Sequence, residues 1–202
     1  MKTVNLFSKA HKFAGGALVI ILLLSSLVAQ GQDRWSIEFR PGINFPTQKL
    51  GDADLKTDFG FEGSLAYRFM PHLSVYGGWS WNRFASDQSF AGANTDFEET
   101  GYTYGLQFIH PISTSKINLL LRAGGLANHI EVENNSGEII ADSGHGFGWQ
   151  AEVGVAIPLG EKWRVQPGLR YRSLSRDIKL NGTTTAVDLN YLSVGVGIVR
   201  IF

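Results

Sequence analysis

Apolar and polar residues alternate along most of the sequence after residue 34. From Trp35 to Phe45 the odd positions are apolar and the even positions are polar or Gly. A period of two places the two sets of side chains on opposite faces of a β-strand. The same alternation recurs at residues 59–69, 73–82, 101–108, 147–157 and 163–172. No segment has the competing period of an amphipathic helix, so we predict an all-β chain.

Two further strands alternate less regularly. In the fifth strand, residues 117–128, Leu120 and Leu126 fall on the polar face, which predicts a tilted, bulged or differently bounded strand. In the last strand, the apolar side chains of residues 187–191 have the opposite parity to those of residues 192–198. An extra residue reverses the facing of all that follow it, so we predict a bulge near Tyr191. With these two, the strands number eight.

The connections between the strands alternate in length. Those after the second, fourth and sixth strands are short and contain Pro, at residues 70–72, 110–116 and 158–162. The other four are long and polar, at residues 46–58, 85–100, 131–146 and 175–188. Short periplasmic turns at one end and long extracellular loops at the other are typical of outer-membrane barrels. We predict an eight-stranded antiparallel up-and-down transmembrane β-barrel over residues 32–202.

Composition indicates which face of this barrel meets lipid. A water-facing sheet carries Lys in mid-strand, but the Lys residues after position 31 lie in loops, turns or at a strand end: Lys49, Lys56, Lys116, Lys162 and Lys179. The strand aromatics fall at two heights, near the long loops and near the short turns, as in interfacial girdles. The alternative is a soluble periplasmic ligand-binding barrel whose apolar face points inward.

The first 31 residues have the features of a secretory signal peptide. Three Lys residues precede an uncharged apolar run at residues 13–28, and Ala29-Gln30-Gly31 supplies small residues for cleavage. The run is shorter than the roughly 20 residues of a spanning helix. We therefore predict that residues 1–31 are removed during export, rather than kept as an anchor.

The charge balance and the missing thiols exclude several classes of function. The sequence has 18 Lys and Arg against 18 Asp and Glu, and it has no Cys. A neutral chain offers no electrostatic reason for a nucleic-acid partner. Without Cys there are no disulfides, thiolate metal sites or cysteine nucleophiles.

Charged residues also occur on the face that we assign to the barrel interior. Eight strands enclose an interior just wide enough for side chains, where carboxylates and guanidiniums are expected to pair. We predict a lumen charge network and a filled lumen, formed by Glu38, Arg40, Glu62, Arg68, Arg122, Glu152, Arg164, Arg170 and Arg172. The Arg residues outnumber the Glu residues here, so the alternative is a narrow, weakly anion-favouring pore.

No constellation in the sequence predicts catalysis or a cofactor. His72-Leu73-Ser74 resembles the His-x-Ser spacing of a lipid A deacylase, but it lies at the short-turn end, and a triad also needs an orienting acid. His129 and His145 flank the third long loop, which is rich in acids. These residues could form a metal site or include a catalytic His, and the alternative is that they are ordinary polar residues exposed to water. We predict no enzyme, cofactor or metal, with a lipid A-modifying enzyme kept as an alternative.

The whole pattern, with a chain that ends in Ser193-Val-Gly-Val-Gly-Ile-Val-Arg-Ile-Phe202, resembles the small outer-membrane β-barrel domain family. This family includes the barrel of outer membrane protein A and outer membrane protein X. The tract Asp188-Leu-Asn-Tyr-Leu-Ser193 is similar to porin family proteins of the Bacteroidota. The resemblance implies a Gram-negative cell outer membrane, and assembly by the barrel-assembly machinery with the terminal Phe202 as its signal. Arg200 is a departure from this pattern, because the family usually has an apolar residue two positions before the end of the chain.

The sequence therefore predicts an integral outer-membrane protein. Its partners are outer-membrane lipid and lipopolysaccharide, and the expected state is a monomer. We expect a structural, envelope-maintenance or adhesive surface role. Most of the acids lie in the long loops, where they either bind divalent cations that bridge lipopolysaccharide phosphates or serve as a solvated surface.

Overall fold

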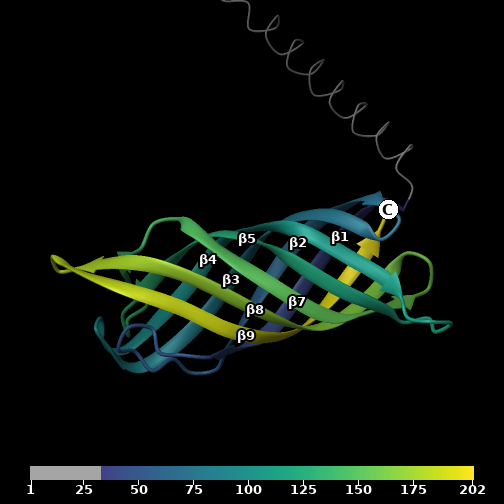
Figure 1. Ribbon diagram of the computed structural model, residues 1–202. Coiled ribbons are helices and arrows are strands. Elements are labelled where there is room, and N and C mark those ends of the chain that lie inside the picture. Colours follow the sequence, from purple (N-terminus) through teal and green to yellow (C-terminus); the bar gives the residue numbers. More distant parts are fainter. Residues whose placement is uncertain (1–32) are drawn as a thin grey trace, which may run out of the picture.

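The computed structural model describes residues 33–202, which form a closed antiparallel β-barrel (Figure 1). The predicted signal peptide, residues 1–31, lies outside the described residues. The strands are β1 (Trp35–Pro46), β2 (Asp58–Met70), β3 (Leu73–Ser89), β4 (Gly92–Pro111), β5 (Asn118–Glu133), β6 (Ile139–Asp142), β7 (Gly146–Leu159), β8 (Trp163–Leu180) and β9 (Thr183–Ile201). The described part of the chain contains no helix that is long and apolar enough to cross a membrane.

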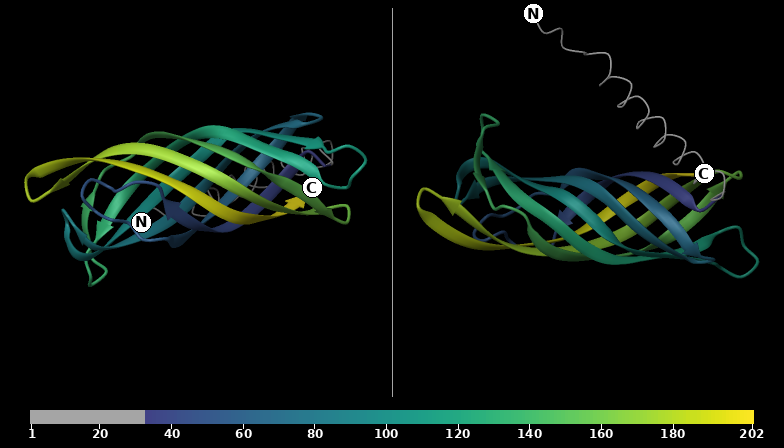
Figure 2. Two further views of the ribbon diagram at one scale, coloured as in Figure 1. Left: turned by 60° about the horizontal axis from the view of Figure 1, so that its bottom comes forward. Right: turned by 90° about the horizontal axis from the view of Figure 1, so that it is seen from above.

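Eight of these strands close the barrel. Each barrel strand pairs with the next one along the chain, and β5 pairs with β7 because β6 is not part of the barrel wall. The first strand, β1, pairs antiparallel with the last, β9, which closes the barrel. The short strand β6 only extends the edge of β5 within the loop that leads to β7. The C-terminus lies at the end with the short turns, opposite the β8–β9 hairpin (Figure 2). The predicted eight-stranded up-and-down topology is confirmed.

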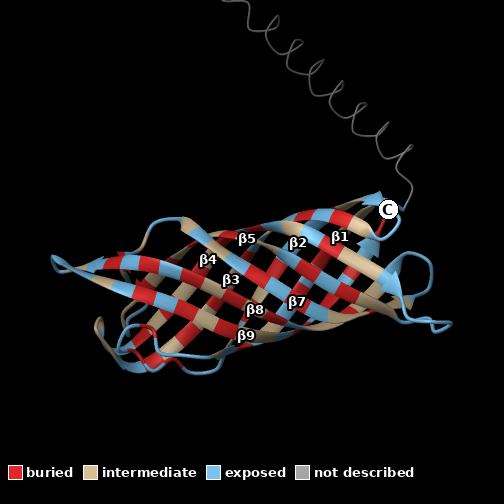
Figure 3. Ribbon diagram, in the orientation of Figure 1, coloured by how far each residue is buried: buried red, intermediate tan, exposed pale blue. Residues whose placement is uncertain are grey.

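The burial pattern is the reverse of that in a water-soluble protein. Along each strand, buried and exposed residues alternate (Figure 3), and the exposed set is apolar, as at Ile37, Val153 and Ile198, which are each 50–52% exposed. The buried set includes Glu, Arg, Asn and Gln. Large apolar surfaces that face outward require a lipid environment. The soluble-barrel alternative, which needs an apolar interior and a polar exterior, is therefore wrong.

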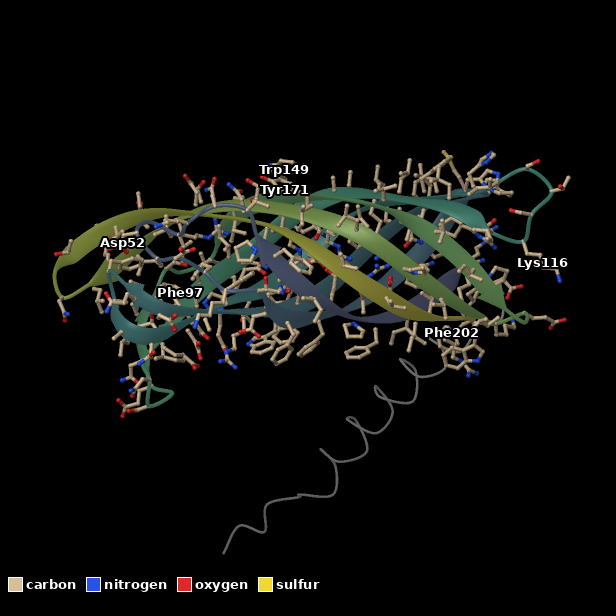
Figure 4. The ribbon with its side chains drawn as sticks, turned by 90° about the horizontal axis from the view of Figure 1, so that it is seen from below. Asp52, Phe97, Lys116, Trp149, Tyr171 and Phe202 are labelled. Carbon is tan, nitrogen blue, oxygen red and sulfur yellow. The ribbon has the colours of Figure 1, made fainter. Side chains whose placement is uncertain are left out.

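The outer surface also carries the predicted aromatic side chains. Tyr102 is 61% exposed and Phe147 80% exposed. Trp149 and Tyr171 pack against each other on the outside of β7 and β8, with ring centroids 5.3 Å apart (Figure 4). These rings point away from the interior, where the two interfacial girdles of a membrane barrel require them.

The bulges predicted for two strands are absent, but the fifth strand is bounded differently from its prediction, because β5 extends to Glu133 rather than ending at residue 128. β5 pairs with β4 and β7 in unbroken register over residues 118–128, with Leu120 and Leu126 fully buried inside. β9 pairs with β8 without a register shift, so there is no bulge near Tyr191. Val187 and Tyr191 face the interior because the extracellular half of the barrel has an apolar core, whereas Val194 faces lipid. Apolar residues therefore occupy both faces of one regular strand.

Two of the predicted long loops are β-hairpins that project beyond the barrel. β3 and β4 continue until only residues 90–91 separate them, and β8 and β9 until only Asn181 and Gly182 remain. Asn181 has φ 50° and Gly182 has φ 81°. A type I′ hairpin turn requires positive φ at both central residues, and Asn-Gly is a pair that adopts this conformation readily. The extracellular end therefore presents ordered hairpins.

Candidate functional site in the barrel interior

Charged side chains from six barrel strands converge in the middle of the interior. At most 7% of any of these side chains is exposed. The set, which we call the lumen charge network, consists of Glu38 and Arg40 on β1, Glu62 on β2, Glu99 on β4, Arg122 on β5, Glu152 on β7, and Arg170 and Arg172 on β8. Alternate residues of each strand face inward, which brings these distant positions together.

The periplasmic part of the network is built around Glu152. Arg40 contacts Glu38 at 2.7 Å and Glu152 at 2.9 Å between nitrogen and oxygen atoms. Arg122 pairs with Glu38 and reaches Glu152 at 3.7 Å. The guanidinium of Arg122 also donates to the side-chain oxygen of Gln107 at 2.8 Å. Glu38 therefore contacts two guanidiniums, and Glu152 contacts these two as well as Arg170.

The extracellular part continues the same pattern. Arg170 joins Glu152 to Glu62, with 2.8 Å to each carboxylate. Arg172 joins Glu62, at 2.7 Å, to Glu99, at 3.3 Å. Burying a charge is costly unless it is paired and hydrogen-bonded. The alternation of carboxylate and guanidinium across the lumen meets that requirement from one wall to the other.

Glu99 is the member of the network that the sequence analysis misses. Its carboxylate accepts hydrogen bonds from the Tyr191 hydroxyl at 2.7 Å and from the Asn82 amide at 2.6 Å. The predicted long loop 85–100 includes Glu99, but Glu99 belongs to β4 and is fully buried. The sequence does contain a signal for this position. Gly101 and Thr103 are on the inward face of the predicted strand, and Glu99 falls on the same face if the strand begins two residues earlier.

With Glu99 included, the lumen charge network holds four carboxylates and four guanidiniums and is formally neutral. The predicted excess of Arg over Glu in this network is wrong for two reasons. Glu99 was omitted, and Arg68 and Arg164 do not join the network. Both line a cavity of about 200 Å³ at the periplasmic mouth, together with Arg34 and His72.

The extracellular half of the interior is filled by apolar side chains, which the sequence analysis does not predict. Its buried members, which we call the apolar core, are Leu50, Ala53, Leu55, Phe84, Phe97, Leu126, Ile130, Val132, Ala141, Leu174, Ile178, Val187, Leu189 and Tyr191. Phe84 and the ring of Tyr191 meet edge to face at 4.9 Å. The Tyr191 hydroxyl also reaches the Glu99 carboxylate, so the two fillings are in direct contact.

The first extracellular loop, residues 47–57, folds into the mouth above this core. Leu50 and Ala53 hydrogen-bond to each other through their backbones and are fully buried. The Asp52 carboxylate accepts the backbone N–H of Phe90 at 2.7 Å, which fastens the loop to the β3–β4 hairpin. Asp52 and Phe97 lie at this end, and Lys116 and Phe202 lie at the other (Figure 4).

Little empty space remains in the middle of the lumen. A cavity lined by Arg40, Glu62, Arg170 and Arg172 has a volume of about 20 Å³. A single water needs roughly 10–15 Å³ on this measure. The cavity therefore has room for about one water molecule.

Comparison with known proteins places this barrel in a family. The model of the family described as "outer membrane protein beta-barrel domain" matches residues 17–199. The chain belongs to this outer-membrane β-barrel family. It is therefore a protein of the cell outer membrane, embedded in the lipid bilayer. A search of the curated proteins finds no match.

Solved structures of outer-membrane barrels share the fold. Neisserial surface protein A superposes with a TM-score of 0.60 at 17% identity, covering 83% of this chain and 97% of that one. Outer membrane protein W of E. coli gives 0.57 at 15% identity, with coverages of 85% and 98%. OprG of Pseudomonas aeruginosa gives 0.54 at 16% identity, with coverages of 84% and 98%. At these identities the likeness shows the fold alone.

The other residues singled out in the sequence of this outer-membrane barrel lie at its two ends. His72 hydrogen-bonds through Nδ1 to the carbonyl of Ile109 at 2.9 Å, and Ser74 is buried inside the same periplasmic end. His129 and His145 stack at the extracellular end, with ring centroids 4.4 Å apart.

The C-terminal residue pairs with the first strand. The backbone N–H of Phe202 donates to the carbonyl of Trp35 at 2.9 Å. The guanidinium of Arg200 lies over the rings of Trp163 and Phe202, at 5.2 and 5.5 Å from their centroids. Cation–π contact accommodates a charged residue on an aromatic rim, which explains how Arg200 fits on the outward face.

Proposed function

We propose that this protein is a non-conducting structural barrel of the outer membrane, which maintains the envelope and presents its extracellular hairpins and loops as an interaction surface. The observation that carries the proposal is the double filling of the lumen. The lumen charge network spans the middle of the barrel, and the apolar core with loop 47–57 closes the extracellular half. An ion would have to displace both to cross.

Conductance in planar lipid bilayers tests the closed lumen. We expect the refolded protein to insert without stepwise current at the ionic strengths used for porins. The control is a barrel cleared of filling, with Arg170→Ala, Glu62→Ala and Leu174→Ala combined, checked for folding by its change in gel mobility on boiling. Regular current steps from the unaltered protein would refute the proposal.

A narrow, anion-favouring pore is the second candidate, and one observation favours it. Arg34, Arg68 and Arg164 line the periplasmic cavity of about 200 Å³, which gives that mouth a basic wall. If the barrel conducts, Arg170→Ala and Arg172→Ala are expected to change its ion selectivity, because these two side chains cross the constriction. Unchanged selectivity in a conducting barrel would remove this candidate.

We also propose that the barrel is not an enzyme. His72 lies at the periplasmic end, and its Nδ1 is already hydrogen-bonded to the backbone carbonyl of Ile109. A lipid A-modifying enzyme acts on the outer leaflet, at the opposite end. Lipid A mass spectra from a deletion strain are expected to match those of the parent. A changed acylation pattern, restored by the intact gene, would support the enzyme instead.

We propose that residues 1–31 are a cleaved signal peptide and that the barrel-assembly machinery of a Gram-negative, Bacteroidota-type cell recognises Phe202. We further propose a monomer that contacts lipopolysaccharide. Removal of Phe202 is expected to lower the amount of folded barrel in the outer membrane while leaving export intact. Equal amounts of folded barrel would contradict the assembly role.

A further inference from the structure

Three side chains of types that can bind a metal meet on the outer surface of the extracellular end. His129 and Glu131 face outward from β5, and Asp142 ends the short strand β6. The register of β5 with β6 places Asp142 directly opposite Glu131. One ligand atom from each of these three residues lies within 4.8 Å of the others. Within residues 33–202 this is the one grouping of three such groups.

The three side chains are held by the fold. Nδ1 of His129 lies 3.0 Å from the Asp142 carboxylate and 3.8 Å from the Glu131 carboxylate. The Asp142 carboxylate also accepts the backbone N–H of Gly144 at 2.7 Å, which fixes its orientation. The His129 ring stacks on His145, at an interplanar angle of 17°. The His129 side chain is only 13% exposed, so its position is set by packing.

The neighbouring charge also suits a cation. Glu98 on β4 lies opposite Glu131 and adds a carboxylate beside the site. Asp96 lies opposite Glu133 but is paired with Arg83 at 3.0 Å, so it adds no free charge.

The donor types select the class of metal. Ca²⁺ and Mg²⁺ prefer sites made only of oxygen, whereas one imidazole with two carboxylates suits Zn²⁺ and related first-row divalent ions. We propose that His129, Glu131 and Asp142 form a binding site for a Zn²⁺-class ion on the extracellular surface. Three protein ligands leave a fourth position open to water.

The position of the site gives it a consequence for the loop. His129 and Glu131 precede the segment 134–141, and Asp142 follows it. A single ion would therefore tie both ends of this segment together. The tip of the segment is exposed and includes Glu138, so bound metal is expected to slow cleavage there by a glutamate-specific protease.

Metal titration of the untagged, refolded barrel tests this proposal. We expect calorimetry to show one Zn²⁺ per chain, unaffected by excess Mg²⁺, and Co²⁺ to develop the visible absorption of a site with nitrogen and oxygen ligands. His129→Ala and Asp142→Asn are each expected to weaken binding at least tenfold. Both residues face outward, so folding is expected to survive, and Glu131→Gln replaces either variant that fails the boiling assay.

A second pair of neighbouring His rings supplies the matched control. His72 and His110 stand at the periplasmic end, with ring centroids 4.7 Å apart. His110→Ala is expected to bind Zn²⁺ and Co²⁺ as the unaltered protein does. The proposal is overturned if the barrel shows no saturable Zn²⁺ binding, if His129→Ala and Asp142→Asn bind normally, or if His110→Ala abolishes the binding.

Discussion

Arg172 and Leu174 are two residues apart on β8, both point into the barrel, and both are 2% exposed. Arg172 belongs to the lumen charge network and Leu174 to the apolar core. The charged half depends on every member having its partner, because an unpaired buried charge is far more costly than a lost contact. The apolar half depends on volume, which different apolar side chains supply. The same barrel is therefore closed by two layers with different tolerance to change.

The largest effect is expected from removing one charge of the network. Glu62→Ala leaves the guanidiniums of Arg170 and Arg172 without a shared carboxylate. We expect a loss of about 3–5 kcal/mol in the free energy of unfolding, measured by urea titration in lipid vesicles. Glu161→Ala, in an exposed periplasmic turn, is the control and is expected to be neutral. A loss below about 1 kcal/mol at Glu62 would contradict the coupled network.

Truncation in the apolar core comes next. Leu174→Ala creates a cavity among side chains that are almost completely buried, and we expect a loss of about 3 kcal/mol in the same titration. Val194→Ala, on the lipid-facing side of β9, removes methyl groups without making an internal cavity and is expected to cost less. Equal losses at the two positions would show that the extracellular half is not a packed core.

Conservative substitutions sharpen the comparison. Arg172→Lys keeps the charge but loses the forked geometry that reaches Glu62, Glu99 and Gln150, and we expect a cost of about 2 kcal/mol. Leu174→Met nearly preserves volume and is expected to cost less than about 1 kcal/mol. If Leu174→Met costs more stability than Arg172→Lys, the forked geometry of the guanidinium is not what stabilises the lumen charge network.

The smallest effect is expected where a charge pair is open to water. Lys162 donates to Asp33 at 2.6 Å, and this bond lowers the pKa of the exposed Asp33 carboxyl. A lowered pKa stabilises the fold above the ordinary pKa of Asp, and the contribution disappears as the pH falls through the lowered value. Water screens this pair, so Asp33→Asn is expected to match the unaltered barrel in thermal unfolding at pH 7. A clear decrease would show that exposed pairs matter here.

The sequence predicts the lipid-facing half of this architecture well, because one face of each strand must be apolar over its whole membrane span. The strand number, the closure and the outward aromatics follow from that single periodicity. The position of Trp149 illustrates this, since its parity alone places it outside.

The interior is less predictable because lipid imposes no pattern on it. Val187, Leu189 and Tyr191 point inward like Ser193, yet they are apolar, and their pattern falsely indicates a bulge. The contents of the lumen depend on which strands meet at one height, and that is set by register rather than by local sequence. Asn181-Gly182 was a usable local signal, because it marks the tight turn of the β8–β9 hairpin.

The accessibility of the lumen to water-borne reagents tests the closed interior most directly. The sequence has no Cys, so a Cys introduced by substitution is the only thiol that a reagent can label. Ser80 is fully buried and contacts Arg172 in the network, whereas Ser36 lines the periplasmic cavity. In folded barrels we predict that a small charged thiol reagent labels Ser36→Cys promptly and Ser80→Cys only after unfolding. Equal labelling at both positions before unfolding would contradict a closed lumen.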